Sequence, residues 1–345
     1  MSISYESRES AGIREDQDGI RFSCYHCFRS TYEAAMVVVM KSDMSIGIVG
    51  AGVMGTALGI GLSATGYNLS FVTSRTERSA IRLINRIPGS QYSNSPAEFS
   101  QACDLIFITT PDDLIRNVAD TFPWKAGQAV IHCSGARGLS ILDPARAQGA
   151  SVGAFHPFQT FSNVTSSTEA ISRFAGIYFA IEAQGVLLKV LREMAKRLGG
   201  KALFVDDKHR ALYHSSAVLS CGYLVTVLYS SVQLLKEVGL SEVEALDAIG
   251  TMAHSTVQSV RRAGLMGAFT GPVARGDTTT LDRQLRALTT SDTGLLKLFT
   301  ALTEASLPMI RETLSKDKRK EILKLVMRYD TDSNKNNIIR RNGSV

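Results

Sequence analysis

From residue 44 onward, the chain alternates short apolar runs with longer segments in which apolar residues recur every three or four positions. The short runs are typical of buried strands, and the longer segments are typical of helices that bury one face. This alternation predicts crossover connections and therefore an α/β domain with a mostly parallel sheet. The predicted strands cover residues 46–49, 69–73, 105–109, 129–132, 152–155, 177–181 and 202–205.

The first predicted strand runs into the motif Gly50-x-Gly52-x-x-Gly55, which is typical of a turn that binds a dinucleotide. We expect Gly50 to form the tight turn, Gly52 to leave room for a pyrophosphate, and Gly55 to let a helix pack closely on the strand. The apolar spacing that follows predicts a helix that ends near Gly66. The predicted phosphate contacts are Gly50, Gly52, Val53, Met54 and Gly55. A glycine-rich turn without a ligand is the alternative.

The residues after the second strand bear on the choice of cofactor. NAD-binding chains carry an acidic residue about 20 positions after the glycines. Here Ser74, Arg75 and Thr76 follow the strand, and the first acid is Glu77. Hydroxyls and a guanidinium suit a 2′-phosphate, so this segment predicts NADP. A solvated loop is the alternative.

Hydroxyl residues also follow the third and fourth long strands. Thr110 and Ser134 stand at carboxyl ends, which line the ligand crevice in an open α/β sheet. We therefore expect both to contact the nicotinamide half of the cofactor. Capping of the following helices explains the two hydroxyls equally well.

After Asp207, helical periodicity replaces the strand pattern. We expect one long helix over residues 208–238, whose central part, residues 211–235, contains no Lys, Arg, Asp or Glu. Its Ser, Thr, His and Gln residues make it too polar for an ordinary membrane span, so a buried helix is the better interpretation. Ser241 and Glu244 form a capping-box pattern that predicts the start of the next helix.

The pattern divides the chain into four parts. Residues 1–43 lack sustained periodicity and are predicted to be a disordered extension. The predicted domains are a dinucleotide-binding domain over residues 44–207 and a helical domain over residues 208–328, with breaks at Gly271-Pro272 and Pro308. Residues 329–345 are predicted to be a polar tail.

Composition narrows the possible functions. With 44% hydrophobic and 20% charged residues, the chain reads as globular. The formal charge of +6 comes from scattered basic residues, so we expect a small anionic ligand and neither a nucleic-acid nor a membrane partner. Five cysteines, with Cys24 and Cys27 lacking a second zinc-type pair, indicate free thiols, no metal site and a cytoplasmic protein.

Four segments, taken in order, resemble the DUF2520 family of Rossmann-like proteins with an appended helical domain. They are His132-Cys-Ser-Gly-Ala136, His156-Pro-Phe-Gln-Thr-Phe161, Arg210-Ala-Leu-Tyr-His214 and Gly271-Pro-Val-Ala-Arg-Gly-Asp277. More distantly, the chain is similar to pyrroline-5-carboxylate reductase and the 6-phosphogluconate dehydrogenase class. The resemblance implies a Rossmann-type sheet, an all-helical 6-phosphogluconate-dehydrogenase-like C-terminal domain that dimerises, and a nicotinamide-dependent reductase. Members of the DUF2520 family often carry Asn where Gly222 stands here.

Three residues are the predicted catalytic groups. His214 and Tyr213 stand near the start of the long helix, and His156 follows a predicted strand and precedes a proline. We expect His214 to act as the acid or substrate anchor, with His156 and Tyr213 as orienting groups, because a histidine can deliver the proton that follows hydride transfer. Structural hydrogen bonding is the alternative for each. Arg275 and Asp277 are expected to lock a loop or, alternatively, to bind substrate.

The sequence therefore predicts an NADPH-dependent reductase that acts on a small carbonyl or imine in the cleft between its domains. The alternative is a non-catalytic protein that binds NADP as a regulatory or structural ligand, which the departure at Gly222 leaves open. A homodimer formed through the helical domain is expected in either case, since the charge-free helix needs apolar cover.

Overall fold

The computed structural model describes residues 44–161, 166–291 and 293–342, without the side chains of residues 293 and 331–342. The predicted extension, residues 1–43 with Cys24 and Cys27, lies outside the described residues. The chain forms two compact units, the first ending at Cys221 and the second beginning at Gly222. The helix α9 (Asp207–Ser220) therefore belongs to the first unit, whereas the predicted domain boundary precedes it.

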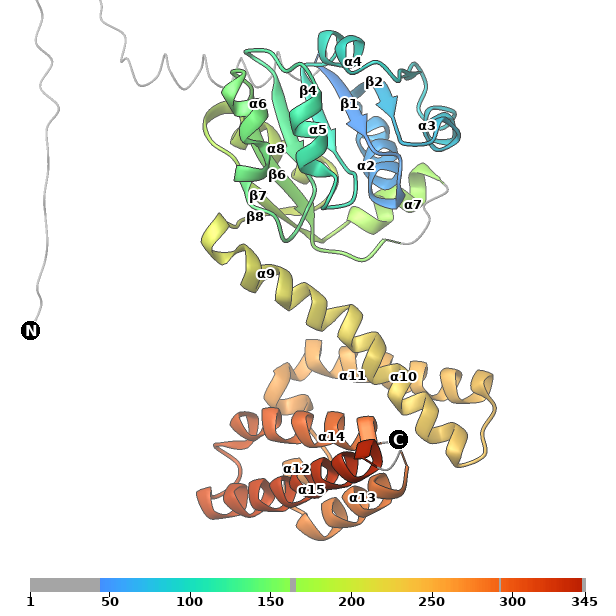
Figure 1. Ribbon diagram of the computed structural model, residues 1–345, viewed down its shortest axis with the longest axis vertical. Coiled ribbons are helices and arrows are strands. Elements are labelled where there is room, and N and C mark those ends of the chain that lie inside the picture. Colours follow the sequence, from blue (N-terminus) through green and yellow to red (C-terminus); the bar gives the residue numbers. More distant parts are fainter. Residues whose placement is uncertain (1–43, 162–165, 292, 343–345) are drawn as a thin grey trace, which may run out of the picture. The chain divides into compact units, whose positions relative to one another are not determined.

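An eight-stranded sheet forms the centre of the first unit (Figure 1), with the strand order β3-β2-β1-β4-β5-β6-β7-β8. Every neighbouring pair is parallel except β6 and β7, which confirms the predicted mostly parallel sheet. The strands are β1 (Ser45–Val49), β2 (Asn68–Thr73), β3 (Gln91–Tyr92), β4 (Leu105–Ile108), β5 (Ala129–His132), β6 (Ser151–Pro157), β7 (Tyr178–Glu182) and β8 (Lys201–Phe204).

Helices cover both faces of this sheet. One face packs on α2 (Val53–Ala64), α3 (Glu77–Ile84), α7 (Ser167–Phe174) and α8 (Gly185–Arg197). The other face packs on α4 (Pro96–Ala102), α5 (Ile115–Thr121), the 3₁₀ helix η1 (Leu139–Leu142) and α6 (Asp143–Ala147). The central strands are apolar at successive positions because both of their faces are buried.

Several short elements of the first unit were not predicted. The helices α4, α5 and α7 are only seven or eight residues long, too short to give a clear helical period. A local signal did exist for α4: Ser95 precedes Pro96, and the Ser95 hydroxyl accepts a 3.3 Å hydrogen bond from the Glu98 N–H. The two-residue strand β3 is set by its pairing with β2.

One row of residues crosses five strands on the α5 face of the sheet. Val49, Ile108, His132, Ala154 and Glu182 are successive backbone partners in the order β1, β4, β5, β6 and β7. Side chains of paired residues point to the same face. The row therefore aligns a histidine and a carboxylate on either side of a small alanine.

The long helix predicted over residues 208–238 is divided into α9 and α10 (Gly222–Glu237). Cys221 separates them because its φ of −122° and ψ of −79° are not helical. The expectation that this stretch is buried is wrong, since 6% of its most apolar window is buried. Among the described residues, Asp207–Glu237 is also the one helical stretch long and apolar enough to span a membrane, a criterion that core helices meet as well.

The second unit is built from helices alone in its described part. α10 packs against α11 (Glu242–Ala268), which bends at Gly264, and the remaining elements surround a separate apolar core. Those elements are α12 (Pro272–Arg275), α13 (Thr278–Thr290), α14 (Thr293–Ser306), the 3₁₀ helix η2 (Leu307–Ile310) and α15 (Lys316–Asn342). The capping box of Ser241 and Glu244 is confirmed. The predicted tail is instead largely helical, because α15 continues to Asn342.

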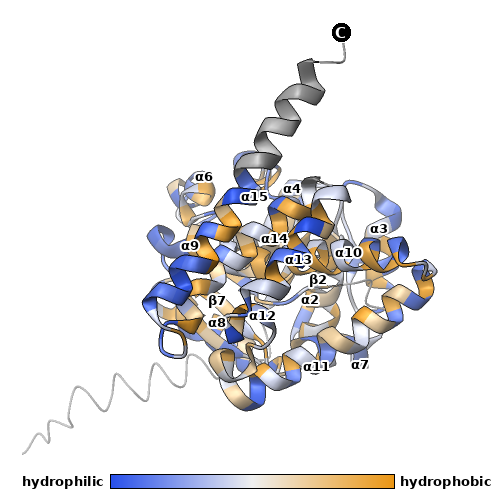
Figure 2. Ribbon diagram, turned by 90° about the horizontal axis from the view of Figure 1, so that it is seen from below, coloured by the Kyte–Doolittle hydropathy of each residue, from blue (hydrophilic) through white to orange (hydrophobic). Residues whose placement is uncertain are grey.

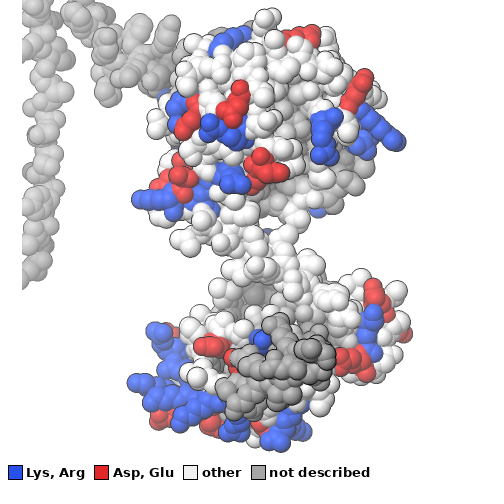
Figure 3. Space-filling model, viewed as in Figure 1, with Lys and Arg blue, Asp and Glu red and all other residues white. Residues whose placement is uncertain are grey.

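Hydrophobic residues lie along α10 and α11 as well as in the sheet (Figure 2). Ala245 is the one residue of α11 that is buried in the described structure. The surface over α9 and α10 is largely white in Figure 3, because residues 211–235 contain no Lys, Arg, Asp or Glu. Residues 211–235, which span most of α9 and α10, thus expose a surface without charged side chains.

Candidate functional site

The turn after β1 has the backbone geometry that the glycine motif predicts. Gly50 adopts a φ of +111°, which residues with a Cβ rarely adopt. A Cβ at Gly52 would meet no atom of the described chain within 4 Å, so the backbone there is open. A Cβ at Gly55 would collide with the Gly50 carbonyl oxygen, so α2 packs this closely only because residue 55 is glycine. The predicted turn at Gly50 and the close packing at Gly55 are confirmed, and pyrophosphate binding at Gly52 stays a prediction.

The start of α2 offers unpaired backbone donors. Gly52 is its N-cap residue, no side chain in the described structure caps it, and its first turn contains no acid. The first hydrogen bond within the helix runs from the Thr56 N–H to the Gly52 carbonyl (2.9 Å), so the N–H groups of Val53, Met54 and Gly55 precede it. Such a helix end attracts anions through its N–H groups and its dipole.

The end of β2 lies beside this turn, because the Gly50 N–H donates to the Thr73 carbonyl (2.8 Å). Ser74 is half-buried, and Arg75 and Thr76 are exposed. The Thr76 hydroxyl donates to Ser79 Oγ (2.8 Å), whereas no ion pair joins Arg75 to another described residue. A guanidinium that is exposed and uncommitted remains available to an anionic ligand.

The end of β4 is tied to the same turn. The Thr109 hydroxyl donates to the Gly50 carbonyl (2.6 Å). The next hydroxyl, Thr110 Oγ1, is buried and has no hydrogen-bond partner in the part of the chain that the structure describes. A buried polar group without a partner is unusual, and a ligand at the turn would supply one.

Ser134, the other predicted nicotinamide contact, has its hydroxyl engaged in its own loop. Ser134 Oγ donates to Asp112 Oδ2 (2.6 Å) and accepts hydrogen bonds from the N–H groups of Ala136 (3.1 Å) and Arg137 (3.0 Å). The hydroxyl proton is therefore already donated. This arrangement favours a loop-locking role for Ser134.

The three predicted catalytic side chains meet in the first unit. His156 Nδ1 lies 2.7 Å from the Tyr213 hydroxyl, and the two rings are nearly perpendicular. The rings of His156 and His214 have centroids 6.2 Å apart. Tyr213 and His214 follow one another on α9, while His156 is the penultimate residue of β6. Residues 57 positions apart in the sequence thus form one cluster.

Gly135 lets the His156 and His214 rings pack directly against the backbone of the loop after β5. A Cβ at residue 135 would lie 2.6 Å from His214 Cδ2 and 2.8 Å from His156 Nε2. A Cβ at Gly138, three residues further along the same loop, would collide with the Asp207 carboxylate at the start of α9. The loop after β5 can therefore lie flat against α9 because two of its residues are glycine.

Burial sets the protonation of this cluster. Burial, with smaller effects from His214 and Arg210, lowers the pKa of His156 to about 4, and Asp112 opposes the shift. Burial raises the pKa of Tyr213, which Arg210 partly offsets. Near neutral pH His156 is therefore a neutral imidazole and Tyr213 a protonated phenol.

The buried residues Arg210 and His132 both interact electrostatically with His156. Arg210 is 1% exposed; it donates to Glu182 Oε2 (2.7 Å) and to the Val205 carbonyl (3.1 Å). Burial, followed by Arg210 and His156, lowers the pKa of His132 to about 3. His132 Nδ1 accepts the Ser134 N–H (3.2 Å), so the ring proton resides on Nε2. Sequence reasoning missed Glu182 and Asp112, whose contacts with Arg210 and Ser134 span 28 and 22 residues.

Other candidates lie apart from this cluster or have structural partners. His209 is exposed and pairs with Asp206 (2.6 Å), and no group of three or more potential metal ligands occurs among the described residues. Asp277 accepts the Thr280 N–H (3.0 Å) and so caps α13, and this hydrogen bond lowers the pKa of its carboxyl. Gly222 begins α10, where an added Cβ would meet no described atom within 4 Å.

Two family models match the chain. A Rossmann-like domain matches residues 32–157, and a domain of unknown function, DUF2520, matches residues 177–306. A Rossmann-like segment is thus followed by a DUF2520 segment, as the sequence resemblance predicts. Among curated proteins, no sequence matches this chain.

Solved structures share the fold across most of the chain. A protein from Bacteroides fragilis, described as an NADP oxidoreductase, is 24% identical and covers 76% of this chain and 97% of its own, with a TM-score of 0.62. A Thermotoga maritima protein is 21% identical, with coverages of 77% and 98% and a TM-score of 0.60. Pyrroline-5-carboxylate reductase from Streptococcus pyogenes is 15% identical, with coverages of 84% and 98% and a TM-score of 0.52. At these identities the likeness is one of fold.

Proposed function

We propose that this protein is an NADP-dependent oxidoreductase that reduces a small carbonyl or imine substrate. The observation that carries the proposal is that the glycine turn and His156 lie at the carboxyl ends of strands in the same parallel part of the sheet. The glycine turn follows β1, and His156 lies near the end of β6. The intervening strands β4 and β5 are parallel to both. A cofactor held at the turn would extend along the carboxyl ends of these strands toward the histidines.

The glycine turn fits the pyrophosphate of a dinucleotide. Open backbone at Gly52 and the uncapped start of α2 give room and N–H donors. The orphaned Thr110 hydroxyl would gain a partner from the ligand. Gly50, Gly52, Val53, Met54 and Gly55 are the proposed phosphate contacts.

The segment after β2 favours NADP over NAD. Arg75 carries a fork of donors that suits a 2′-phosphate, and Ser74 and Thr76 add hydroxyls beside it. The description of the Bacteroides fragilis protein as an NADP oxidoreductase agrees with this choice.

The residues of the cluster supply the rest of the chemistry. When bound, the reduced nicotinamide provides a hydride. His156, Tyr213 and His214 lie close together, and such side chains can hold a polar substrate group and deliver a proton. We assign His214 to substrate contact, because its ring lies beside that of His156 on a neighbouring element.

Residue 222 favours a second candidate function. Where relatives of the DUF2520 family often carry Asn, Gly222 presents no side chain. If that amide is essential to catalysis, this chain binds NADP as a regulatory or structural ligand and catalyses nothing. Gly222→Asn separates the two: a gain of turnover would support the non-catalytic state of the natural chain.

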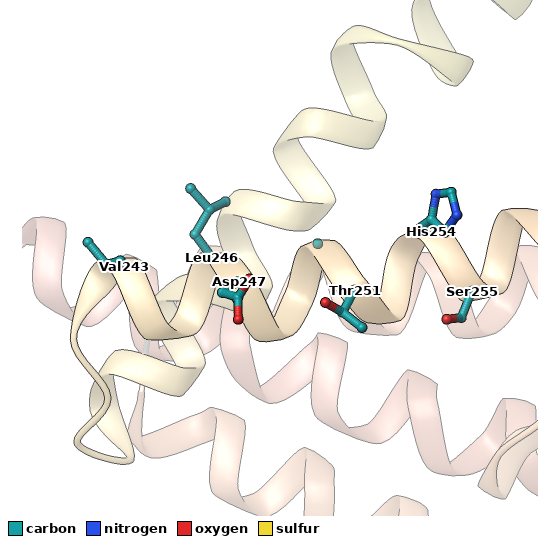
Figure 4. A pocket seen from close by; sticks show the side chains of 7 residues that line it. Val243, Leu246, Asp247, Thr251, His254 and Ser255 are labelled. Carbon is teal, nitrogen blue, oxygen red and sulfur yellow. The ribbon is translucent and has the colours of Figure 1, made fainter.

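We also propose a homodimer formed through α10 and α11, in the cytoplasm. Apolar side chains on these helices are largely exposed, among them Val225, Tyr229, Val243 and Leu246. A shallow hollow of about 660 Å³ lies along α11 and is lined by that helix alone (Figure 4). A second copy would cover these side chains, since monomers rarely expose a continuous apolar surface of this kind.

The proposed function is tested by cofactor titration and by a substrate screen. NADPH should bind more tightly than NADH, and ketones, aldehydes and imines are then screened for NADPH consumption. His214→Ala should lower turnover about 10²- to 10⁴-fold and leave cofactor affinity unchanged. His209→Ala, on the same helix but exposed, is the matched control. A chain that binds neither NADPH nor NADH would refute the proposal.

A further inference from the structure

We propose that Asp112 positions the rings of His156 and His214. It acts through the Ser134 hydroxyl, which fixes the loop after β5. This inference rests on the proposed function, in which the histidines hold the substrate and deliver a proton, and it adds a positioning residue to that site. It also gives Ser134 a role in the loop in place of the nicotinamide contact expected from the sequence.

The segment that carries Asp112 is fixed on one side by the glycine turn. The Thr109 N–H donates to the Val49 carbonyl (2.8 Å), and the Thr109 hydroxyl donates to the Gly50 carbonyl (2.6 Å). Asp112 follows three residues later, directly after Pro111, whose ring restricts the backbone. The Asp112 carboxylate therefore extends from a backbone whose position is set at the turn.

Asp112 sets the direction of one buried hydroxyl. Ser134 is 5% exposed, and its Oγ donates to Asp112 Oδ2 (2.6 Å). Because a hydroxyl has a single proton, this bond leaves the lone pairs of Oγ to accept the N–H groups of Ala136 (3.1 Å) and Arg137 (3.0 Å). Removal of the carboxylate would leave the buried O–H without this acceptor, an unfavourable state that the loop can relieve by moving.

The turn that Ser134 closes contains Gly135, against which both histidine rings pack. A Cβ on Gly135 would lie 2.6 Å from His214 Cδ2 and 2.8 Å from His156 Nε2. The Gly135 Cα is one bond from that position, so both rings lie against the backbone of this turn. Close-packed atoms cannot move independently of one another. A displaced loop would therefore displace both rings.

The charge of Asp112 is a separate route to His156. Burial lowers the pKa of His156, and the negative charge of Asp112 opposes this shift. The bond and the charge can be separated, because asparagine keeps an acceptor oxygen and carries no charge. In Asp112→Asn the Ser134 hydroxyl still has an acceptor, whereas Asp112→Ala removes both bond and charge. The positioning role requires that the bond carries the effect.

The positions of the two rings are measurable without cofactor or substrate. In ¹H–¹³C spectra of the full chain with labelled histidine, Asp112→Ala should shift the ring signals of His156 and His214. Asp112→Asn should leave both signals close to their natural positions, and so should Asp113→Ala, the matched control at the exposed neighbouring carboxylate. Signals that stay in place in Asp112→Ala, or that move equally in Asp112→Asn, would overturn the inference.

A double-mutant cycle tests whether Asp112 acts through Ser134. Ser134→Ala removes the same link from its other end, so it should move the same two ring signals. In the Ser134→Ala background, Asp112→Ala should add little, because the bond that it breaks is already absent. Additive shifts would mean that Asp112 reaches the rings by another route, which contradicts the proposal.

Turnover connects the ring positions to the proposed reaction. Asp112→Ala should lower kcat about tenfold or more, because a small displacement of reacting groups slows a reaction strongly. NADPH affinity should stay the same, since the glycine turn is intact, and Asp112→Asn should keep most of the natural turnover. Natural kcat in Asp112→Ala would overturn the positioning role and leave the proposed function standing. A chain that binds neither NADPH nor NADH would refute the proposed function, while the spectra still decide the link from Asp112 to the rings.

Discussion

Arg210 lies almost completely buried and donates a 2.7 Å hydrogen bond to Glu182, which stands at the end of β7. The backbone row across the sheet places Ala154 between Glu182 and His132, so a small residue separates the carboxylate from the histidine. The ion pair holds α9 to the sheet at the turn that precedes Tyr213 and His214. Loss of this ion pair should therefore both destabilise the fold and displace Tyr213 and His214.

Removal of the Glu182 charge should destabilise the first unit. Glu182→Gln leaves the buried guanidinium without its counter-charge, and we expect the free energy of unfolding to fall by about 2–4 kcal/mol. Asp120→Asn is the matched control, because its ion pair with Arg116 is about half exposed and should contribute less than about 1 kcal/mol. Urea unfolding measures both. Equal effects of the two variants would contradict the buried-pair interpretation.

Alanine substitutions at two glycines should have opposite effects, because an added Cβ collides with neighbours at Gly135 and meets none at Gly222. In Gly135→Ala the new Cβ would displace the rings of His156 and His214, so we expect activity to fall at least tenfold and the melting temperature to drop. Gly222→Ala meets no described atom and lies in a helix, so its melting temperature should stay the same or rise slightly. Calorimetry of the two variants checks this, and a tolerated Gly135→Ala would argue against the crowded site.

Arg75 should determine the preference for NADPH. Arg75→Ala removes the proposed partner of the 2′-phosphate, and we expect NADPH affinity to fall by about tenfold or more with little change for NADH. Arg82→Ala, on α3, serves as control because its guanidinium already donates to the Ser79 hydroxyl. Fluorescence titration gives both affinities. An unchanged NADPH affinity in Arg75→Ala would remove the basis for the NADP assignment.

The two buried histidines should make the fold sensitive to acid. Burial lowers the pKa of His156 to about 4 and that of His132 to about 3, whereas both titrate near 6.5 in the unfolded chain. Between these values the unfolded chain binds protons that the folded chain does not, so stability falls as pH decreases from about 6.5 to 4. We expect a loss of a few kcal/mol over that range in urea unfolding.

A histidine variant identifies the source of this acid sensitivity. His156→Gln should reduce the slope of stability against pH, because the variant has no ring to titrate. The exposed His209→Gln should leave the slope in place. A slope that is the same in all three proteins would assign the effect to other groups.

The proposed dimer should depend on the apolar surface of α11. Val243→Glu combined with Leu246→Glu places charges on side chains that are 79% and 60% exposed in the single chain. We expect light scattering to show a dimer for the natural protein and a monomer for the double variant. Leu114→Glu, an exposed apolar residue of the first unit, should leave the mass unchanged. A natural chain that is monomeric at micromolar concentration would refute the dimer.

Local chemistry made much of the fold predictable from the sequence. Gly50 and Gly55 each have one backbone requirement that no other residue meets equally well, and the capping box of Ser241 and Glu244 lies within one helical turn. The apolar strands were also recognisable, because a parallel sheet buries both faces.

The remaining features depend on tertiary contacts. The break at Cys221 follows from non-helical backbone angles in an otherwise helix-forming stretch, and nothing in its composition signals them. The bond between His156 and Tyr213 and the pair of Arg210 and Glu182 join distant parts of the chain. The exposure of residues 211–235 was also not predictable. An apolar helix has the same sequence pattern whether it packs against its own chain or against another.

The short connection from β8 into α9 has a consequence for insertions and deletions. Arg210, Tyr213 and His214 occupy one face of α9 at intervals of three and four residues, and Asp206 fixes the first turn by accepting the His209 N–H (3.1 Å). One residue added between Asp206 and Arg210 would turn that face by about 100°. The ion pair and the bond to His156 would then be lost together. Natural length variation should therefore be absent from this connection, even though most surface loops tolerate it.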